Sequence, residues 1–152
     1  MDVLKENPNC KIHTFDCTST NFTVPHDNIN FHGWCLGNSE GQKSFEDIIH
    51  MMGHENRFID ILKVDCEGCE YKIYKDFFSD NITIDQLLIE THRFGWLHES
   101  FWITYERKLL DYLHVKGFNM FLEAKNPFTG CCTEYGWINN NKTINQFVTK
   151  RV

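Results

Sequence analysis

The clearest chemical feature of this sequence is a group of carboxylates that directly follows an apolar segment. Residues 58–64 are mostly apolar, and the chain then continues into Asp65, Glu67 and Glu70. This pattern predicts a buried parallel strand that leaves the core and carries acids to its carboxyl end. Open α/β sheets bind ligands at that end of their strands, so these acids are candidates for ligand binding or catalysis.

A second apolar segment ends in the same way. Residues 84–89 are followed by Glu90 and His92, which stand two positions apart and face the same side of an extended strand. A carboxylate beside a histidine can hold the imidazole in one tautomer for work as a base, or bind a metal together with it. Asp65, Glu90 and His92 could converge on a divalent cation, but no spacing motif requires one, and the sequence predicts no dedicated metal site.

Each of these acids also has a plainer interpretation. Glu67 and Glu70 suit the first turn of a helix after the strand, where the helix dipole favours negative charge, and we interpret them chiefly in that way. Asp65 lies on the strand side, so we assign it a functional role. Asp16 ends an earlier strand, where an acid can accept hydrogen bonds from a ribose diol; the alternative is a solvated turn residue.

The cysteines are numerous but show no strong motif. Cys66 and Cys69 form a C-x-x-C at a strand-to-helix junction, which makes a dithiol redox protein a weaker alternative, because neighbouring acids raise thiol pKa values. A structural zinc site would need a second spaced pair. For a chain with enough material for a core, the sequence favours reduced thiols. Three more are expected in or near the core: Cys10, Cys17 and Cys35.

The periodicity of apolar residues predicts an α/β fold in which strands alternate with helices. Strands are expected at residues 10–15, 29–36, 58–64, 84–89, 118–123 and 134–138, and helices at 3–9, 44–53, 69–78 and 102–116. Such alternation implies parallel pairing through right-handed crossovers. The last two strands are joined by a loop too short for a crossover, so they should be antiparallel.

Composition restricts the classes of partner. The chain of 152 residues is long enough for one domain with a core, and its net charge of −6 comes without a basic cluster, so nucleic acid is not an expected partner. No segment approaches the roughly 18 apolar residues of a membrane span. Residues 1–6 do not have the pattern of a signal peptide, which predicts a cytoplasmic location if the chain is complete. A secretory route, favoured weakly by three glycosylation triplets, is the alternative if a segment precedes. Oligomeric state is not predicted.

The segment Asp60-Ile61-Leu62-Lys63-Val64-Asp65-Cys66-Glu67-Gly68-Cys69-Glu70 resembles a strand of FkbM-type and animal methyltransferase-like domains that use S-adenosylmethionine (SAM). Residues 86–92 resemble the next strand of that family, residues 11–16 its second strand, and residues 126–135 its C-terminal hairpin. The resemblance implies the Rossmann-like sheet of class I methyltransferases, mostly parallel with an antiparallel C-terminal strand.

The same resemblance assigns roles to the acids. Asp16 would bind the ribose of SAM, Asp65 would lie near the methyl donor, and Glu90 would contact the cofactor and, with His92, line the acceptor side. Methyl transfer is a direct displacement, so the protein mainly aligns donor and acceptor and excludes water. An oxygen acceptor on a small molecule or glycan also needs a base, for which His92 or Asp65 is the candidate.

The sequence departs from that family at its beginning. Only about a dozen residues precede the strand that ends at Asp16, and they contain no glycine, so the first strand and the glycine-rich loop of that family are not found there. We therefore expect residues 1–152 to be a single, N-terminally incomplete methyltransferase-like domain whose first strand is missing. The competing hypothesis is a degenerate, non-catalytic domain of the same fold.

Overall fold

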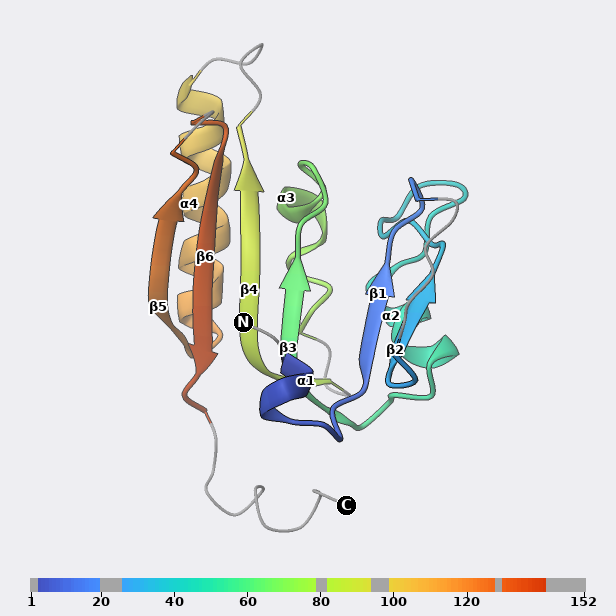
Figure 1. Cartoon of the computed structure of the whole chain (residues 1–152). Coiled ribbons are helices and arrows are strands. Elements are labelled where there is room, and N and C mark those ends of the chain that lie inside the picture. The colour runs from blue at the N-terminus through green and yellow to red at the C-terminus, as the bar shows by residue number, and fades with distance from the viewer. Residues whose placement is uncertain (1–2, 20–25, 79–81, 94–98, 128–129, 142–152) are drawn as a thin grey trace.

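A computed structural model of the chain describes all residues except 1–2, 20–25, 79–81, 94–98, 128–129 and 142–152. It confirms an α/β fold (Figure 1). The elements are α1 (Val3–Glu6), β1 (Ile12–Phe15), β2 (Ile29–His32), α2 (Phe45–Met51), β3 (Phe58–Val64), α3 (Glu70–Ile73), β4 (Thr83–His92), α4 (Glu99–Val115), β5 (Phe118–Lys125) and β6 (Cys132–Asn139).

The larger sheet has four strands in the order β3-β4-β6-β5. β3 and β4 are parallel, and β6 runs antiparallel to both β4 and β5. The predicted antiparallel C-terminal pair is therefore confirmed. Because β3 and β4 are parallel, their carboxyl ends, with the residues that follow them, lie at one edge of this sheet.

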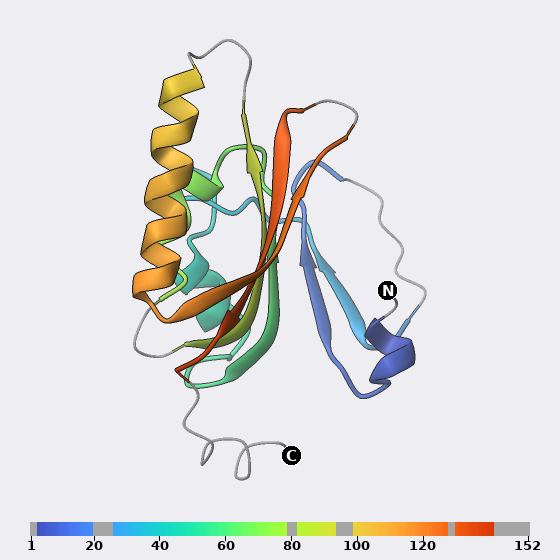
Figure 2. The same cartoon turned by 90° about the vertical axis from the view of Figure 1, so that its left-hand side faces the viewer.

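A smaller parallel sheet is formed by β1 and β2. Figure 1 shows that β1 is the nearer of these two strands to β3 and points the same way, and Figure 2 shows the two sheets diverging. In the described part of the chain no ladder joins β1 to β3, so the two sheets are separate.

The core lies between the larger sheet and the helices α2, α3 and α4, which all cover the same face of it (Figure 2). The long helix α4 is amphipathic and contributes Leu109 and Leu113, both fully buried, opposite Leu87 of β4 and Phe118 of β5. The start of α2 is fixed by a reciprocal capping box, in which Ser44 Oγ accepts from the backbone N–H three residues on. Amphipathic patterning thus predicted α2 and α4, two of the three helices that cover this core.

The structure corrects two sequence expectations about local structure. The strand β3 is not covered on both faces: Ile61 is 44% exposed, on the side of the sheet away from the helices. The helix expected over residues 69–78 is a single turn, α3, followed by turns. Tyr74 and Phe77 are nevertheless buried, because the turns keep their side chains on the core side.

The cysteines are also different from expectation. The structure pairs Cys17 with Cys35, and Cys66 with Cys69, and it joins the neighbours Cys131 and Cys132. Cys10 is the free cysteine. The expectation of reduced thiols is therefore wrong for these pairs, since folding brings their sulfurs to bonding distance. Within the described residues, the helices are all too short or too polar to cross a membrane.

Candidate functional site

The candidate site lies at the carboxyl ends of the parallel strands β3 and β4. Asp65 follows the last residue of β3, while Glu90 and His92 are among the last three residues of β4. They line an open pocket of about 300 Å³, at the lower end of the size range of small-molecule sites. The pocket is lined by Asp65, Glu67, Glu90, His92, Arg93, Asn126, Cys131 and Cys132.

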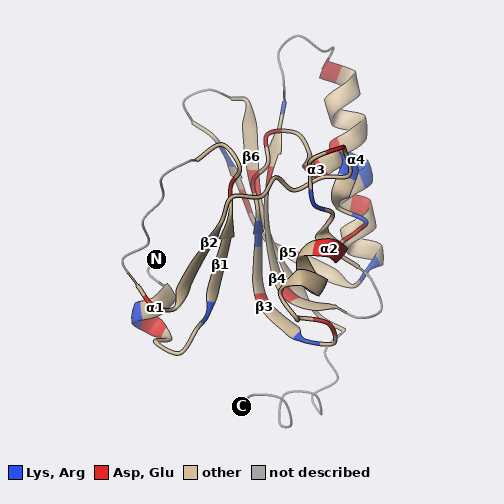
Figure 3. Cartoon of the chain, turned by 90° about the vertical axis from the view of Figure 1, so that its right-hand side faces the viewer, with Lys and Arg blue, Asp and Glu red and all other residues tan. Residues whose placement is uncertain are grey.

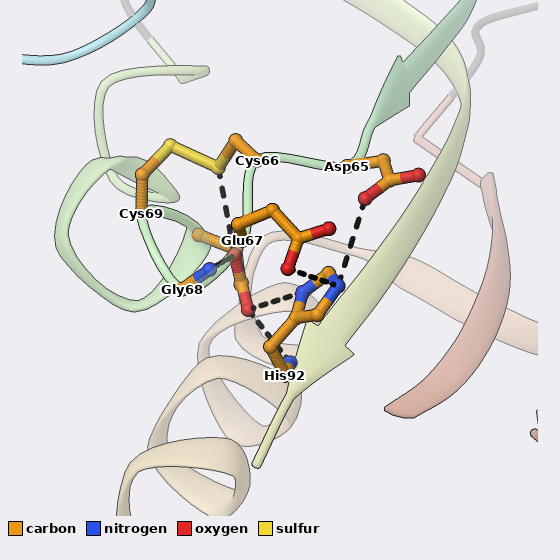
Figure 4. The surroundings of a disulfide bond; sticks show 7 residues. Asp65, Cys66, Glu67, Gly68, Cys69 and His92 are labelled. Carbon is orange, nitrogen blue, oxygen red and sulfur yellow. Dashed lines mark hydrogen bonds and ion pairs between the residues drawn. A yellow bond between two sulfur atoms is a disulfide. The ribbon is translucent and has the colours of Figure 1, made fainter. Parts of the chain in front are cut away.

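The imidazole of His92 is buried and is held by a buried carboxylate. Only 6% of its side chain is exposed, and its Nδ1 lies 3.2 Å from Oε1 of Glu70, which has no exposed surface (Figure 4). The same carboxylate accepts hydrogen bonds from the backbone N–H of His92 at 2.7 Å and of Gly68 at 2.8 Å. Glu70 therefore fixes both the ring and the backbone of His92, together with the loop that follows β3.

On its other side the ring faces two carboxylates. His92 Nε2 lies 3.7 Å from Oδ1 of Asp65 and 3.5 Å from Oε2 of Glu67. The side chains of these acids are 41% and 79% exposed, and both point toward the ring (Figure 4). The arrangement places one imidazole nitrogen among negative charges at the mouth of the pocket.

A left-handed loop brings Glu67 over the ring. Glu67 has φ 54° and Gly68 has φ 98°, so two consecutive residues adopt the left-handed region. A non-glycine residue in this conformation is destabilising by about 1–2 kcal/mol. The loop folds back in this way because Glu70 accepts the Gly68 N–H, and Gly68 supplies the freedom that the turn requires.

The charge in the pocket is unbalanced. Partial burial, and then the negative charge of Asp65, raise the pKa of Glu90 above its ordinary value, and a hydrogen bond with Asp65 acts in the same direction. The neighbouring His92 opposes this shift. A raised carboxyl pKa means that the site favours an added proton or another positive group.

Behind the pocket lies a polar network that the sequence did not predict. Arg93 donates to Oε2 of the buried Glu106 at 2.6 Å. The other oxygen of Glu106 accepts from Thr91 at 2.8 Å and from Tyr135 at 3.2 Å. The network ties α4 to β4 and β6 and holds the residue after His92 against the pocket wall. Glu106 lies on the apolar, core-facing side of α4, and an acid at such a position in the sequence could have indicated a buried polar network.

The structure brings three of the four predicted site residues together. Asp65, Glu90 and His92 converge at the pocket, as expected from the two strand ends. Asp16 does not line this pocket, because it follows β1 in the other sheet. Its Oδ1 accepts from the backbone N–H and hydroxyl of Thr18, and these hydrogen bonds lower the pKa of Asp16.

Glu70 has a role in the site that the sequence did not predict. It does begin α3, as expected of an acid favoured by the helix dipole. However, it is fully buried and supports His92, which an exposed first-turn acid does not do. Its spacing of five residues after Asp65 was visible, but burial could not be inferred from that spacing.

Comparison with models of protein families gives a match to this chain. A family model described as a methyltransferase domain matches residues 1–139, which include every element described above. No curated protein and no solved structure matches the chain. The matched residues contain both strands of the pocket and the acids and histidine that line it. The chain therefore belongs to a methyltransferase domain family.

Proposed function

We propose that this domain binds SAM at the carboxyl ends of its parallel strands and transfers the methyl group to an oxygen of a small molecule or glycan. The observation that supports this most directly is the convergence of Asp65, Glu90 and His92 in one pocket. Ligands of open α/β sheets bind at this edge, and membership of a methyltransferase domain family implies a methyl donor.

The charge of the pocket fits SAM. The cofactor carries a positive sulfonium and an amino group, whereas the pocket holds Asp65 and Glu90 close enough to raise the pKa of Glu90. A positive group beside them would remove that conflict. Asp16 follows β1, which points the same way as β3 in Figure 1, so we assign it to the ribose at the same edge.

The chemistry divides between cofactor and protein. Bound SAM supplies an electrophilic methyl group; the chain's residues orient the acceptor and accept its proton. If His92 donates Nδ1–H to Glu70, its Nε2 presents a lone pair to the pocket and can take a proton from an acceptor hydroxyl. Asp65 is the alternative base, 3.7 Å from the same nitrogen.

The two sheets fit the same proposal. The order β3-β4-β6-β5 would form one part of a class I methyltransferase sheet, and β1 with β2 the other. A first strand between β1 and β3, with its glycine-rich loop, would join them and approach the methionine part of SAM. Our expectation of a missing first strand remains a prediction of this proposal.

The partners follow from the pocket and the surface. Figure 3 shows Lys and Arg scattered among Asp and Glu on the described chain, which supports a small-molecule or glycan acceptor over nucleic acid. The three disulfides favour an oxidising compartment, and therefore the secretory alternative.

Calorimetric titration with SAM and with its demethylated product tests the proposal. The parent chain should bind both, and Asp65→Asn should weaken binding at least tenfold, about 1.4 kcal/mol, because a carboxylate facing the sulfonium is lost. The control is Glu46→Gln, an exposed acid in the first turn of α2 that should bind as the parent does.

Failure has two recognisable forms. No heat at millimolar ligand with a folded parent chain would favour the degenerate domain. Equal affinity for Asp16→Ala and the parent would remove Asp16 from the ribose site and leave the pocket assignment standing. Methyl transfer itself requires an acceptor screen with radiolabelled SAM.

A further inference from the structure

We propose that Asp65, Glu67 and His92 form a binding site for one divalent transition-metal ion of the zinc class. One oxygen from each acid and Nε2 of the histidine lie within 4.8 Å of one another. The proposal goes beyond methyl transfer and does not depend on it, because the three ligands come from the geometry of the loop after β3 and the end of β4 alone.

The distances between these atoms suit a shared cation better than hydrogen bonds. N–H···O bonds are about 2.7–3.2 Å long, whereas Nε2 lies 3.5 Å from Glu67 and 3.7 Å from Asp65. Two ligands at about 2.1 Å from a tetrahedral zinc ion are separated by about 3.4 Å. The observed separations are close to this ligand–ligand distance, so an ion could bind after small movements of two partly exposed carboxylates.

The buried partner of His92 prepares it to be a ligand. Metal-binding histidines usually give their second ring N–H to a carboxylate or carbonyl, which fixes the tautomer and the ring orientation. Here Nδ1 faces the fully buried Glu70 at 3.2 Å, which leaves Nε2 to point at Asp65 and Glu67. Held in this way, Nε2 can give its lone pair to a cation that the carboxylates of Asp65 and Glu67 also bind.

A second group shares the same histidine but is less suitable. Among the described residues, Glu90, His92 and Cys132 also place their potential ligand atoms close together. Cys132 is bonded to Cys131, and a disulfide sulfur is not the thiolate that binds zinc. With that disulfide intact, Asp65 and Glu67 are the better partners for His92.

The donor set indicates the kind of ion. One imidazole and two carboxylates suit zinc and its first-row neighbours, whereas magnesium prefers oxygen ligands and water. The pocket beside the three ligands leaves room for water or an acceptor hydroxyl on the ion. An ion there would lower the pKa of such a bound hydroxyl.

The test is titration of the disulfide-intact chain with Zn²⁺ by calorimetry, and with Co²⁺ by its visible ligand-field absorption. The parent should bind one equivalent at this site. Glu67→Gln and Asp65→Asn should each lower the affinity for this ion by about tenfold or more, because even residues that only support the ligands of a metal site contribute that much. Glu67 is exposed, so its variant should keep the parent's circular dichroism.

Two controls exclude other sites. His32→Gln disrupts a separate pair of histidines, in which His13 Nδ1 lies 3.1 Å from His32 Nε2. Glu90→Gln removes an acid of the second group. Both variants should still bind one equivalent of the metal ion at the proposed site. The proposal is overturned if the parent binds neither ion, if Glu67→Gln and Asp65→Asn bind like the parent, or if only a control variant loses the ion.

Discussion

Replacing Glu70 tests whether the candidate site is held by one buried carboxylate. Glu70 is fully buried and accepts the backbone N–H groups of Gly68 and His92 at 2.8 and 2.7 Å. Its Oε2 also lies 3.5 Å from Cys66 Sγ, but this contact is not a hydrogen bond, because a disulfide sulfur has no proton to donate. Glu70→Ala would leave two backbone donors without this acceptor.

The magnitude follows from those two donors. A buried polar group left unsatisfied costs about 1–3 kcal/mol, so Glu70→Ala should lower the free energy of unfolding by about 2–6 kcal/mol. Glu70→Gln keeps one acceptor oxygen but turns an NH₂ group toward one donor, so its loss should be about 1–3 kcal/mol. Against a usual total of about 5–15 kcal/mol, the alanine variant should be marginal.

Urea unfolding followed by tryptophan fluorescence measures these differences. Glu46→Gln is the matched control, because Glu46 is also a first-turn acid but is exposed. It should lose no more than the roughly 0.3–1 kcal/mol of a helix-dipole interaction. If both Glu70 variants lose as little as the control, Glu70 does not hold the site and our account of its burial is wrong.

Three further predictions concern titration and thiols. Burial lowers the pKa values of His13, His32 and His54 below 6.5, so as pH falls the unfolded chain takes up protons on these histidines before the folded chain does. The midpoint of thermal unfolding should therefore fall as pH drops from 6.5 through the lowered pKa values. A midpoint that does not change over this range would contradict the prediction. The raised pKa of Glu90 acts in the opposite direction, because its contribution to stability is present below pH 4.5 and is lost as pH rises. In urea unfolding, the free energy of unfolding of Glu90→Gln minus that of the parent should therefore be more positive at about pH 7 than at about pH 4. An equal difference at the two pH values would refute this prediction. Unfolded without reductant, the chain should expose one reactive thiol, Cys10, to a thiol reagent; seven would show that the disulfides are absent.

The sequence predicted the convergence at the pocket because it depends on strand direction alone. Two apolar segments that each end in acids must place those acids together once the strands are parallel neighbours, and β3 and β4 are. The same reasoning succeeded for the antiparallel pair of β5 and β6, where a short loop permits no crossover.

The expectations that failed depend on tertiary contacts. An acid at the start of α3 is equally consistent with an exposed dipole partner and with a buried acceptor, and only packing distinguishes them. An apolar strand does not reveal whether both faces are covered, so the exposure of Ile61 could not be foreseen. Disulfide pairing depends on distances between segments such as those of Cys17 and Cys35.

The two proposals use the same atom, Nε2 of His92, in ways that exclude each other. His92 Nε2 cannot take a proton from an acceptor while its lone pair is held by a metal ion. If His92 is the base, added Zn²⁺ should inhibit methyl transfer and a chelator should restore it. If the ion instead activates the hydroxyl, the chelator should abolish transfer, and Glu67→Gln should reproduce that loss although Glu67 lies on the exposed side of the ring. Because Glu70 orients the same ring in both cases, Glu70→Gln should impair transfer under either mechanism, and only the response to metal distinguishes them.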